Sequence, residues 1–215
     1  MTLLYIGLHC SRFLATLITE KIHPVNTTQP TFKQLTDFFI QIGAASVEHT
    51  EKGYLAHAIG VHNDMREWGG DDNLCRAAMY HSVYGTEYFQ KFTLPVERRS
   101  EVRELIGERA EYLAYYNCAM DRRSFDAAVE RDTSPHLFID RITKKEVELS
   151  PEDFDDLCRV HLCDWLEQAP RSETRDYRRS AYRNMADRLG GIAKESYDKI
   201  FALEEGDPVQ TNIVE

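Results

Sequence analysis

Apolar residues recur at intervals of three and four through nearly all of this 215-residue chain. That spacing gathers them on one face of an α-helix, which takes 3.6 residues per turn. One such face is formed by Tyr54, His57, Ala58, Val61, Met65 and Trp68. No run alternates apolar and polar residues convincingly, as a half-buried strand does. The sequence therefore predicts an all-α protein built as a helical bundle.

The length fits one sizeable domain with terminal extensions. We expect a helix or extension over residues 1–30, a single helical domain over 31–204 and a flexible acidic tail over 205–215. The apolar segment Leu3–Ile18 is too short and too polar to span a bilayer, and no basic residue precedes it as in a secretory signal. No membrane association is predicted.

Capping residues predict where the main helices begin and end. Thr31 starts a helix that ends at Gly43, and Gly69-Gly70 stops the helix that carries His57. Asp71-Asp72 caps the next one, whose inward stripe is Leu74, Ala77, Ala78 and His81. Ser150-Pro151 starts a helix that carries His161 and Asp164.

The rest of the chain is less clearly marked. One amphipathic helix is expected from Val102 to Tyr116, and a last long helix from about Arg175 to Leu203, with Gly190-Gly191 inside it. Between them, residues Arg131 to Ser150 are interpreted as an irregular connection, because Ser134-Pro135 and a charged run interrupt any pattern.

Charge and cysteine content restrict the partners. A net charge of −10 argues against nucleic-acid binding, which needs clustered Lys and Arg, but leaves room for a small anionic substrate in a local basic pocket. The five cysteines form no CxxC pair and fall in apolar helical stretches, which fits a reducing cytosol. A cytoplasmic protein is predicted, and a homodimer is compatible with the sequence.

Three polar residues stand on apolar stripes: His57, His81 and Asp164. A buried imidazole needs a partner, and a buried carboxylate costs several kcal/mol unless a cation or hydrogen bonds compensate it. Imidazole nitrogen and carboxylate oxygen together suit zinc, manganese or iron. We therefore predict a divalent metal site on these three side chains. Taken singly, each is also explained by a core hydrogen bond or an ion pair with arginine.

Two further histidines bear on this site. His161 precedes Asp164 by three residues and shares its face, so it is the expected fourth ligand or a supporting hydrogen-bond donor. His62 is five residues from His57 and is expected to point away from it.

The run Ala77-Ala78-Met79-Tyr80-His81-Ser82-Val83-Tyr84-Gly85-Thr86 and the run Leu162-Cys163-Asp164-Trp165-Leu166 resemble motifs of the HD superfamily of metal-dependent phosphohydrolases. The likeness is greatest to alarmone hydrolases. It implies an HD-like helical bundle with His57, His81 and Asp164 as ligands; Asp121 and Asp187 are other candidates for the distant aspartate. The block from Phe32 to Arg123 also resembles an uncharacterised bacterial and fungal family that has the same His-Ser-Val-Tyr-Gly-Thr run.

Ser82 is the main departure from the HD pattern, which has an aspartate after the histidine. A serine hydroxyl is a poor metal ligand, so the change removes a charge and favours one metal ion over two.

Three hypotheses follow. The first is a mononuclear hydrolase for a small phosphorylated, nucleotide-like substrate, with Ser82 and Arg109 as catalytic residues; Arg98, Arg99 and Arg103 are further candidates to hold the anion. The second is a non-haem iron oxygenase, whose ligand set is also two histidines and a carboxylate. The third is a degenerate HD-like module that binds a ligand or a protein.

Overall fold

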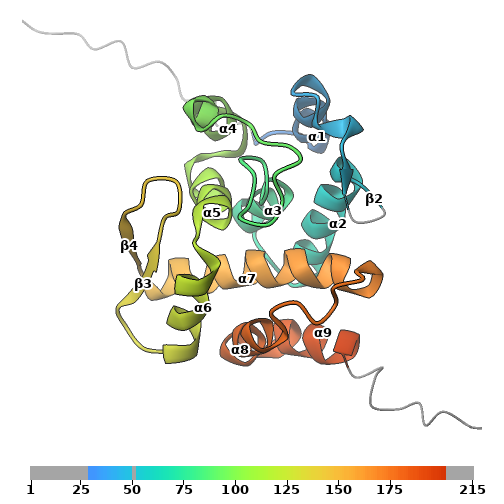
Figure 1. Cartoon of the computed structure of the whole chain (residues 1–215). Coiled ribbons are helices and arrows are strands. Elements are labelled where there is room, and N and C mark those ends of the chain that lie inside the picture. The colour runs from blue at the N-terminus through green and yellow to red at the C-terminus, as the bar shows by residue number, and fades with distance from the viewer. Residues whose placement is uncertain (1–28, 50–51, 202–215) are drawn as a thin grey trace, which may run out of the picture.

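The computed structural model describes residues 29–49 and 52–201. Within that part the chain is mainly helical, as predicted, with α1 to α9 and two short hairpins (Figure 1). The helices are α1 (Phe32–Gln41), α2 (Tyr54–Glu67), α3 (Asp72–Met79), α4 (Arg99–Ile106), α5 (Glu108–Ala119), α6 (Arg122–Arg131), α7 (Pro151–Gln168), α8 (Arg179–Leu189) and α9 (Gly191–Phe201). The strands are β1 (Glu48–His49), β2 (Lys52–Gly53), β3 (His136–Ile139) and β4 (Glu146–Leu149).

Helix α7 is the centre of the molecule. It runs across the view of Figure 1 with α2, α3 and α5 on one side and α8 and α9 on the other, and it packs against all five. Most of the helix is buried: Phe154, Leu157, Val160 and Leu162 are among its buried apolar residues, and Asp156, His161, Asp164 and Glu167 are buried with them. Buried polar side chains need hydrogen-bond or charge partners, so this enclosed helix brings polar groups to the interior that other elements must satisfy.

The predicted helix starts are confirmed by their caps. The Thr31 hydroxyl accepts from the backbone N–H of Gln34 in a complete capping box, and Asp71 accepts from the N–H of Leu74. Ser150 accepts from the N–H of Asp153, directly before Pro151. Each bond satisfies a backbone donor that has no partner inside its helix.

Two of the long helices predicted from the sequence are each broken into two. Gly107, with φ 89° and ψ 158°, separates α4 from α5, and the positive φ angles of Gly190 and Gly191 separate α8 from α9. The apolar period continues across both breaks, because the second helix of each pair still faces the core. Only glycine adopts these backbone angles without strain, so the chain turns there.

The interpretation of residues 131–150 as irregular was wrong. Strands β3 and β4 form an antiparallel hairpin in which His136 pairs with Leu149 and Ile139 with Glu146. The strands are only four residues long, so charged neighbours masked their alternation. Helix α6, which packs on β3, was also missed.

The third correction concerns His81. The predicted stripe carried the helix through His81, but α3 ends at Met79, and residues 80–84 form a turn. His81 is nevertheless buried, with 1% of its surface exposed. Its position therefore depends on what packs around the turn.

One hydrophobic core extends through the described residues, from Leu35 to Phe201. Most of the predicted N-terminal extension, and all of the acidic tail, lie outside those residues. No helix of the described part has the length and apolarity needed to cross a membrane.

Gly107 provides a test of the break between α4 and α5. An alanine there keeps an unfavourable positive φ, so Gly107→Ala is expected to lower the free energy of unfolding by about 1–3 kcal/mol. Urea denaturation followed by circular dichroism measures this. The control, Glu104→Ala, changes an exposed residue of α4 and is expected to stay within about 0.5 kcal/mol of wild type. Equal midpoints for the two variants would contradict the strain argument.

Candidate metal centre

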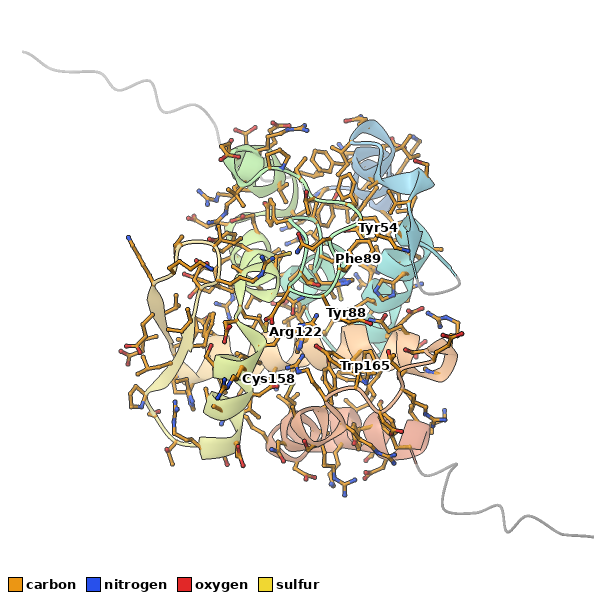
Figure 2. The ribbon with its side chains drawn as sticks, viewed as in Figure 1. Tyr54, Tyr88, Phe89, Arg122, Cys158 and Trp165 are labelled. Carbon is orange, nitrogen blue, oxygen red and sulfur yellow. The ribbon has the colours of Figure 1, made fainter. Side chains whose placement is uncertain are left out.

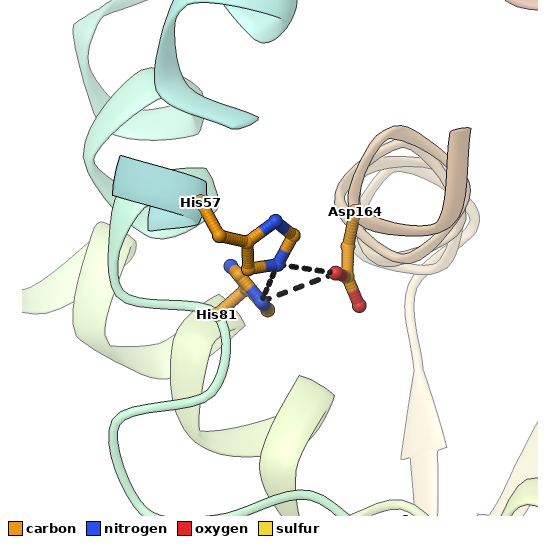
Figure 3. Close-up of side chains that lie close together, drawn as sticks. All are labelled: His57, His81 and Asp164. Carbon is orange, nitrogen blue, oxygen red and sulfur yellow. Dashed lines mark hydrogen bonds and ion pairs between the residues drawn. The ribbon is translucent and has the colours of Figure 1, made fainter. Parts of the chain in front are cut away.

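His57, His81 and Asp164 converge in the interior, as the sequence predicts. His57 comes from α2, His81 from the turn after α3, and Asp164 from α7 (Figure 3). Asp164 Oδ1 lies 3.0 Å from His57 Nε2 and 3.2 Å from His81 Nε2, and the two Nε2 atoms are 3.3 Å apart. Three segments far apart in the sequence thus bring three donor atoms to one point.

These separations fit a single metal ion. Ligand bonds of about 2.1 Å with angles of about 90–109° place neighbouring donor atoms about 3.0–3.4 Å apart. All three distances fall in that range. The triad would leave coordination positions for water or substrate, as three-ligand catalytic sites do.

The hydrogen bond made by Nδ1 of each histidine fixes the tautomer, and so determines that Nε2 faces the centre. His57 Nδ1 lies 2.6 Å from Glu167 Oε2, and His81 Nδ1 lies 2.7 Å from the backbone oxygen of Ala78. Both oxygens are acceptors, so each Nδ1 carries the proton and donates it. Both Nε2 atoms then present lone pairs toward the Asp164 carboxylate. Three lone pairs this close need a positive charge between them, either a metal ion or a proton.

The pKa values of His57 and Asp164 show which side chain carries a proton at this site when no metal is bound. Burial lowers the pKa of His57, but the hydrogen bonds to Asp164 and Glu167 outweigh burial and raise it to about 9. Burial raises the pKa of Asp164, yet the electrostatic interaction with His81 and the hydrogen bonds of the two histidines hold it well below its usual value. A metal ion must therefore displace the Nε2 proton of His57, so binding releases a proton.

Glu167 is the residue that the sequence analysis missed. It follows Asp164 by three residues on α7, binds His57 and also accepts from Arg171 at 2.7 Å. The carboxylate fits because Gly60 faces it from α2: a Cβ atom at Gly60 would lie 2.5 Å from Glu167 Oε1. The sequence did hold a signal, because a spacing of three residues puts Glu167 on the same face of α7 as Asp164. Only the packing of α2 on α7 shows that this face meets His57.

His161 does not join the ligand group, which corrects the expectation of a fourth ligand. Its Nδ1 lies 3.0 Å from Asn117 Oδ1, and its Nε2 lies 2.9 Å from Arg178 Nη1. Burial and the charge of Arg178 lower its pKa well below the ordinary value, so it stays neutral. Asn117 in turn donates to the backbone oxygen of His81 at 2.8 Å. His161 therefore supports the site through Asn117.

The other candidates lie elsewhere. Asp121 caps α6 by accepting from the N–H of Ser124, and Asp187 is paired with Arg183 and Lys194 on the surface. His62 points away from His57, as expected, but it is buried, with its ring 5.2 Å from that of Phe32. Of the three candidate aspartates, Asp164 is thus the one that reaches the histidines.

A cavity of about 360 Å³ opens beside the metal centre. It is lined by His81, Ser82, Thr86, Tyr88, Phe89, Gln90, Lys91, Arg122, Asp164, Trp165, Gln168, Tyr177 and Tyr182. Ser82 lies in this wall next to His81, where its hydroxyl donates to the Tyr54 hydroxyl at 3.1 Å. Figure 2 labels Tyr88, Arg122 and Trp165, which all line this cavity, near one another over the middle of α7.

Arg109 does not line this cavity, contrary to its predicted role of holding an anion. Its guanidinium binds Asp153 and Asp156 at the start of α7, and these carboxylates neutralise it. The other arginines predicted for that role are also paired: Arg98 with Glu101, and Arg99 and Arg103 with the buried Glu111. The arginine that does reach the cavity is Arg122.

Comparison with known proteins adds one match. A family described as a domain of unknown function (DUF6817) matches residues 38–122. The matched span contains His57 and His81 and ends before Asp164. It falls within the block from Phe32 to Arg123 in which the sequence resembles an uncharacterised family. No curated protein and no solved structure matches the chain.

The metal content of the purified protein tests the centre. Wild type, prepared without a metal-affinity tag and reconstituted with Mn²⁺, Fe²⁺ or Zn²⁺, is expected to hold about one equivalent by mass spectrometry. His81→Ala is expected to lose it, because two donors remain. His62→Gln changes a buried histidine outside the cluster and should keep the metal. Equal metal content in His81→Ala and wild type would contradict the assignment.

Glu167 is expected to tune this affinity. Glu167→Gln removes the negative charge that holds the Nδ1 proton of His57, so metal affinity should fall about 10–100-fold. Competition with a chromogenic chelator measures the change. Glu152→Gln makes the same substitution at an exposed position of α7 and should leave affinity unaltered. An unchanged affinity in Glu167→Gln would show that the hydrogen bond to His57 is not part of the metal site.

Proposed function

We propose that this protein is a metal-dependent hydrolase that acts on a small phosphorylated, nucleotide-like substrate through a mononuclear His57, His81 and Asp164 centre. The observation that carries the proposal is the convergence of three donor atoms within 3.3 Å, beside a cavity that two of the three residues, His81 and Asp164, line. A cluster of this kind beside a cavity of substrate size is the arrangement expected of a catalytic site.

A divalent ion bound there would supply Lewis acidity to a water molecule and to a substrate oxygen. The protein supplies the positions. Glu167 and the Ala78 carbonyl orient the two imidazoles, and Gln168 donates to Asp164 Oδ1 at 3.0 Å, which orients the carboxylate. Such fixed partners hold ligands in place and lower the reorganisation needed during reaction.

Ser82 is assigned to the substrate side of this site. Its hydroxyl donates to Tyr54, so its oxygen lone pairs are left to accept from a water or a substrate hydroxyl in the cavity. In this proposal Ser82 orients a reacting group without binding metal.

A single ion is favoured over two. Within residues 29–49 and 52–201, the His57, His81 and Asp164 group is the one whose donor atoms lie close enough for a metal. The nearby carboxylate of Glu167 is already engaged by His57 and Arg171. Ser82, next to His81, offers a neutral hydroxyl where HD enzymes have a carboxylate.

We also propose that the protein works in the cytosol. What supports a reducing compartment is that Cys75, Cys118, Cys158 and Cys163 are free thiols buried in helices. In Cys118, burial also raises the thiol pKa to about 12, which suppresses the reactive thiolate.

Phosphate release tests the function. Protein reconstituted with Mn²⁺, Fe²⁺ or Zn²⁺ is incubated with nucleoside mono-, di- and triphosphates and with sugar phosphates, and inorganic phosphate is measured. Activity is expected with at least one substrate. Asp164→Asn should lower it at least about 100-fold, because the change removes a ligand charge. Asp187→Asn makes the same substitution on the surface and should leave activity unaltered.

Three results would contradict the proposal. Release of phosphate at equal rates by Asp164→Asn and wild type would place the chemistry elsewhere. Oxygen consumption by the iron-loaded protein, without phosphate release, would favour an oxygenase. A protein that binds no metal after reconstitution would be a binding module.

A further inference from the structure

The guanidinium of Arg122 is a buried positive charge in the wall of the cavity beside the metal centre. Only 8% of the residue is exposed. Arg122 is the first residue of α6, and it lines the cavity together with Asp164 and Trp165 of α7 (Figure 2).

The contacts of this guanidinium are few and long. Nη1 donates to the Tyr177 hydroxyl at 3.2 Å and Nη2 to the Thr86 hydroxyl at 3.4 Å. The rings of Tyr88 and Tyr177 lie 5.7 and 5.8 Å from its central carbon. No carboxylate of the described residues forms an ion pair with it; Glu87 accepts from the backbone N–H of Arg122 instead.

Other shielded arginines of the protein are better satisfied. Arg178 pairs with Asp126, and Arg188 pairs with Asp132 and Asp155. Arg76 has no carboxylate partner, yet it donates to Ile106 O and Asn73 Oδ1 at 2.8 Å and to Gln29 Oε1 at 2.5 Å. Arg122 alone among these combines neutral partners, long bonds and a place in the cavity.

A buried charge with weak partners is unfavourable unless something else compensates it. The planar guanidinium presents two parallel N–H groups whose spacing matches the oxygens of a phosphate. An oxyanion in the cavity would therefore accept charge-assisted hydrogen bonds from Arg122 and supply the negative charge that its present partners lack.

We propose that Arg122 binds the phosphate-type oxyanion of the substrate in the cavity that His81 and Asp164 of the metal centre also line. This inference rests on the proposed function, and it replaces Arg109 as the anion-holding residue. The hydroxyls of Thr86 and Tyr177 hold the guanidinium in place, and Tyr88, 63% exposed, offers an aromatic face to the group that the phosphate is attached to.

Calorimetric titration with inorganic phosphate tests the proposal on the full chain, as purified and after chelation. Arg122→Gln removes the charge and should weaken phosphate binding at least tenfold. Arg122→Lys keeps the charge without the planar fork and should fall between Arg122→Gln and wild type. Arg183→Gln removes an exposed arginine of α8, paired with Asp187 and Asp198, and should bind phosphate as wild type does. Circular dichroism checks that each variant folds; if Arg122→Gln does not, the lysine variant decides.

Phosphate affinity that is equal in the Arg122 variants and wild type would overturn the assignment. So would the absence of phosphate binding by wild type in both metal states. Binding that depends on Arg122 but comes with no hydrolysis of any substrate would leave the anion site standing and remove the proposed hydrolase. Conversely, hydrolysis whose KM is unchanged in Arg122→Gln would keep the hydrolase and remove the anion site.

Discussion

The close approach of three lone pairs in the protein interior is the interaction on which the rest of the site depends. His57 Nε2, His81 Nε2 and Asp164 Oδ1 lie 3.0–3.3 Å apart, and none of these residues is more than 6% exposed. Such a group repels itself unless a cation lies at its centre. In the metal-free protein the proton on His57 Nε2 supplies that positive charge, and a metal ion can replace the proton.

The surrounding structure keeps this group together. Glu167 holds His57 from α7, and Gly60 leaves the space that the carboxylate needs. His81 lies in a turn, so its backbone is fixed by other means: Asn117 and Cys118 both donate to its oxygen. These two bonds tie the turn to α5 and so hold the backbone that positions the ligand.

The electrostatics of the cavity differ from those of the whole chain. The protein carries a net charge of −10, yet Arg122 and Lys91 line the cavity beside the metal centre. The arginines that the sequence suggested for anion binding are instead paired with Asp or Glu side chains, as Arg109 is with Asp153 and Asp156. A small anion can thus be attracted locally by a protein that repels polyanions overall.

The sequence by itself determined what depends on near neighbours along the chain. Helical periodicity, the caps at Thr31, Asp71 and Ser150, and the inward faces of His57 and Asp164 all follow from spacings of a few residues. Tertiary structure decided what depends on which helices meet. It placed Glu167 beside His57 and His161 beside Asn117. It also buried His81 on a turn, and it surrounded the Arg122 guanidinium with hydroxyl groups and with no carboxylate partner among the described residues. The physical reason is that such hydrogen bonds and ion pairs join residues up to 110 positions apart, and no local pattern encodes those distances.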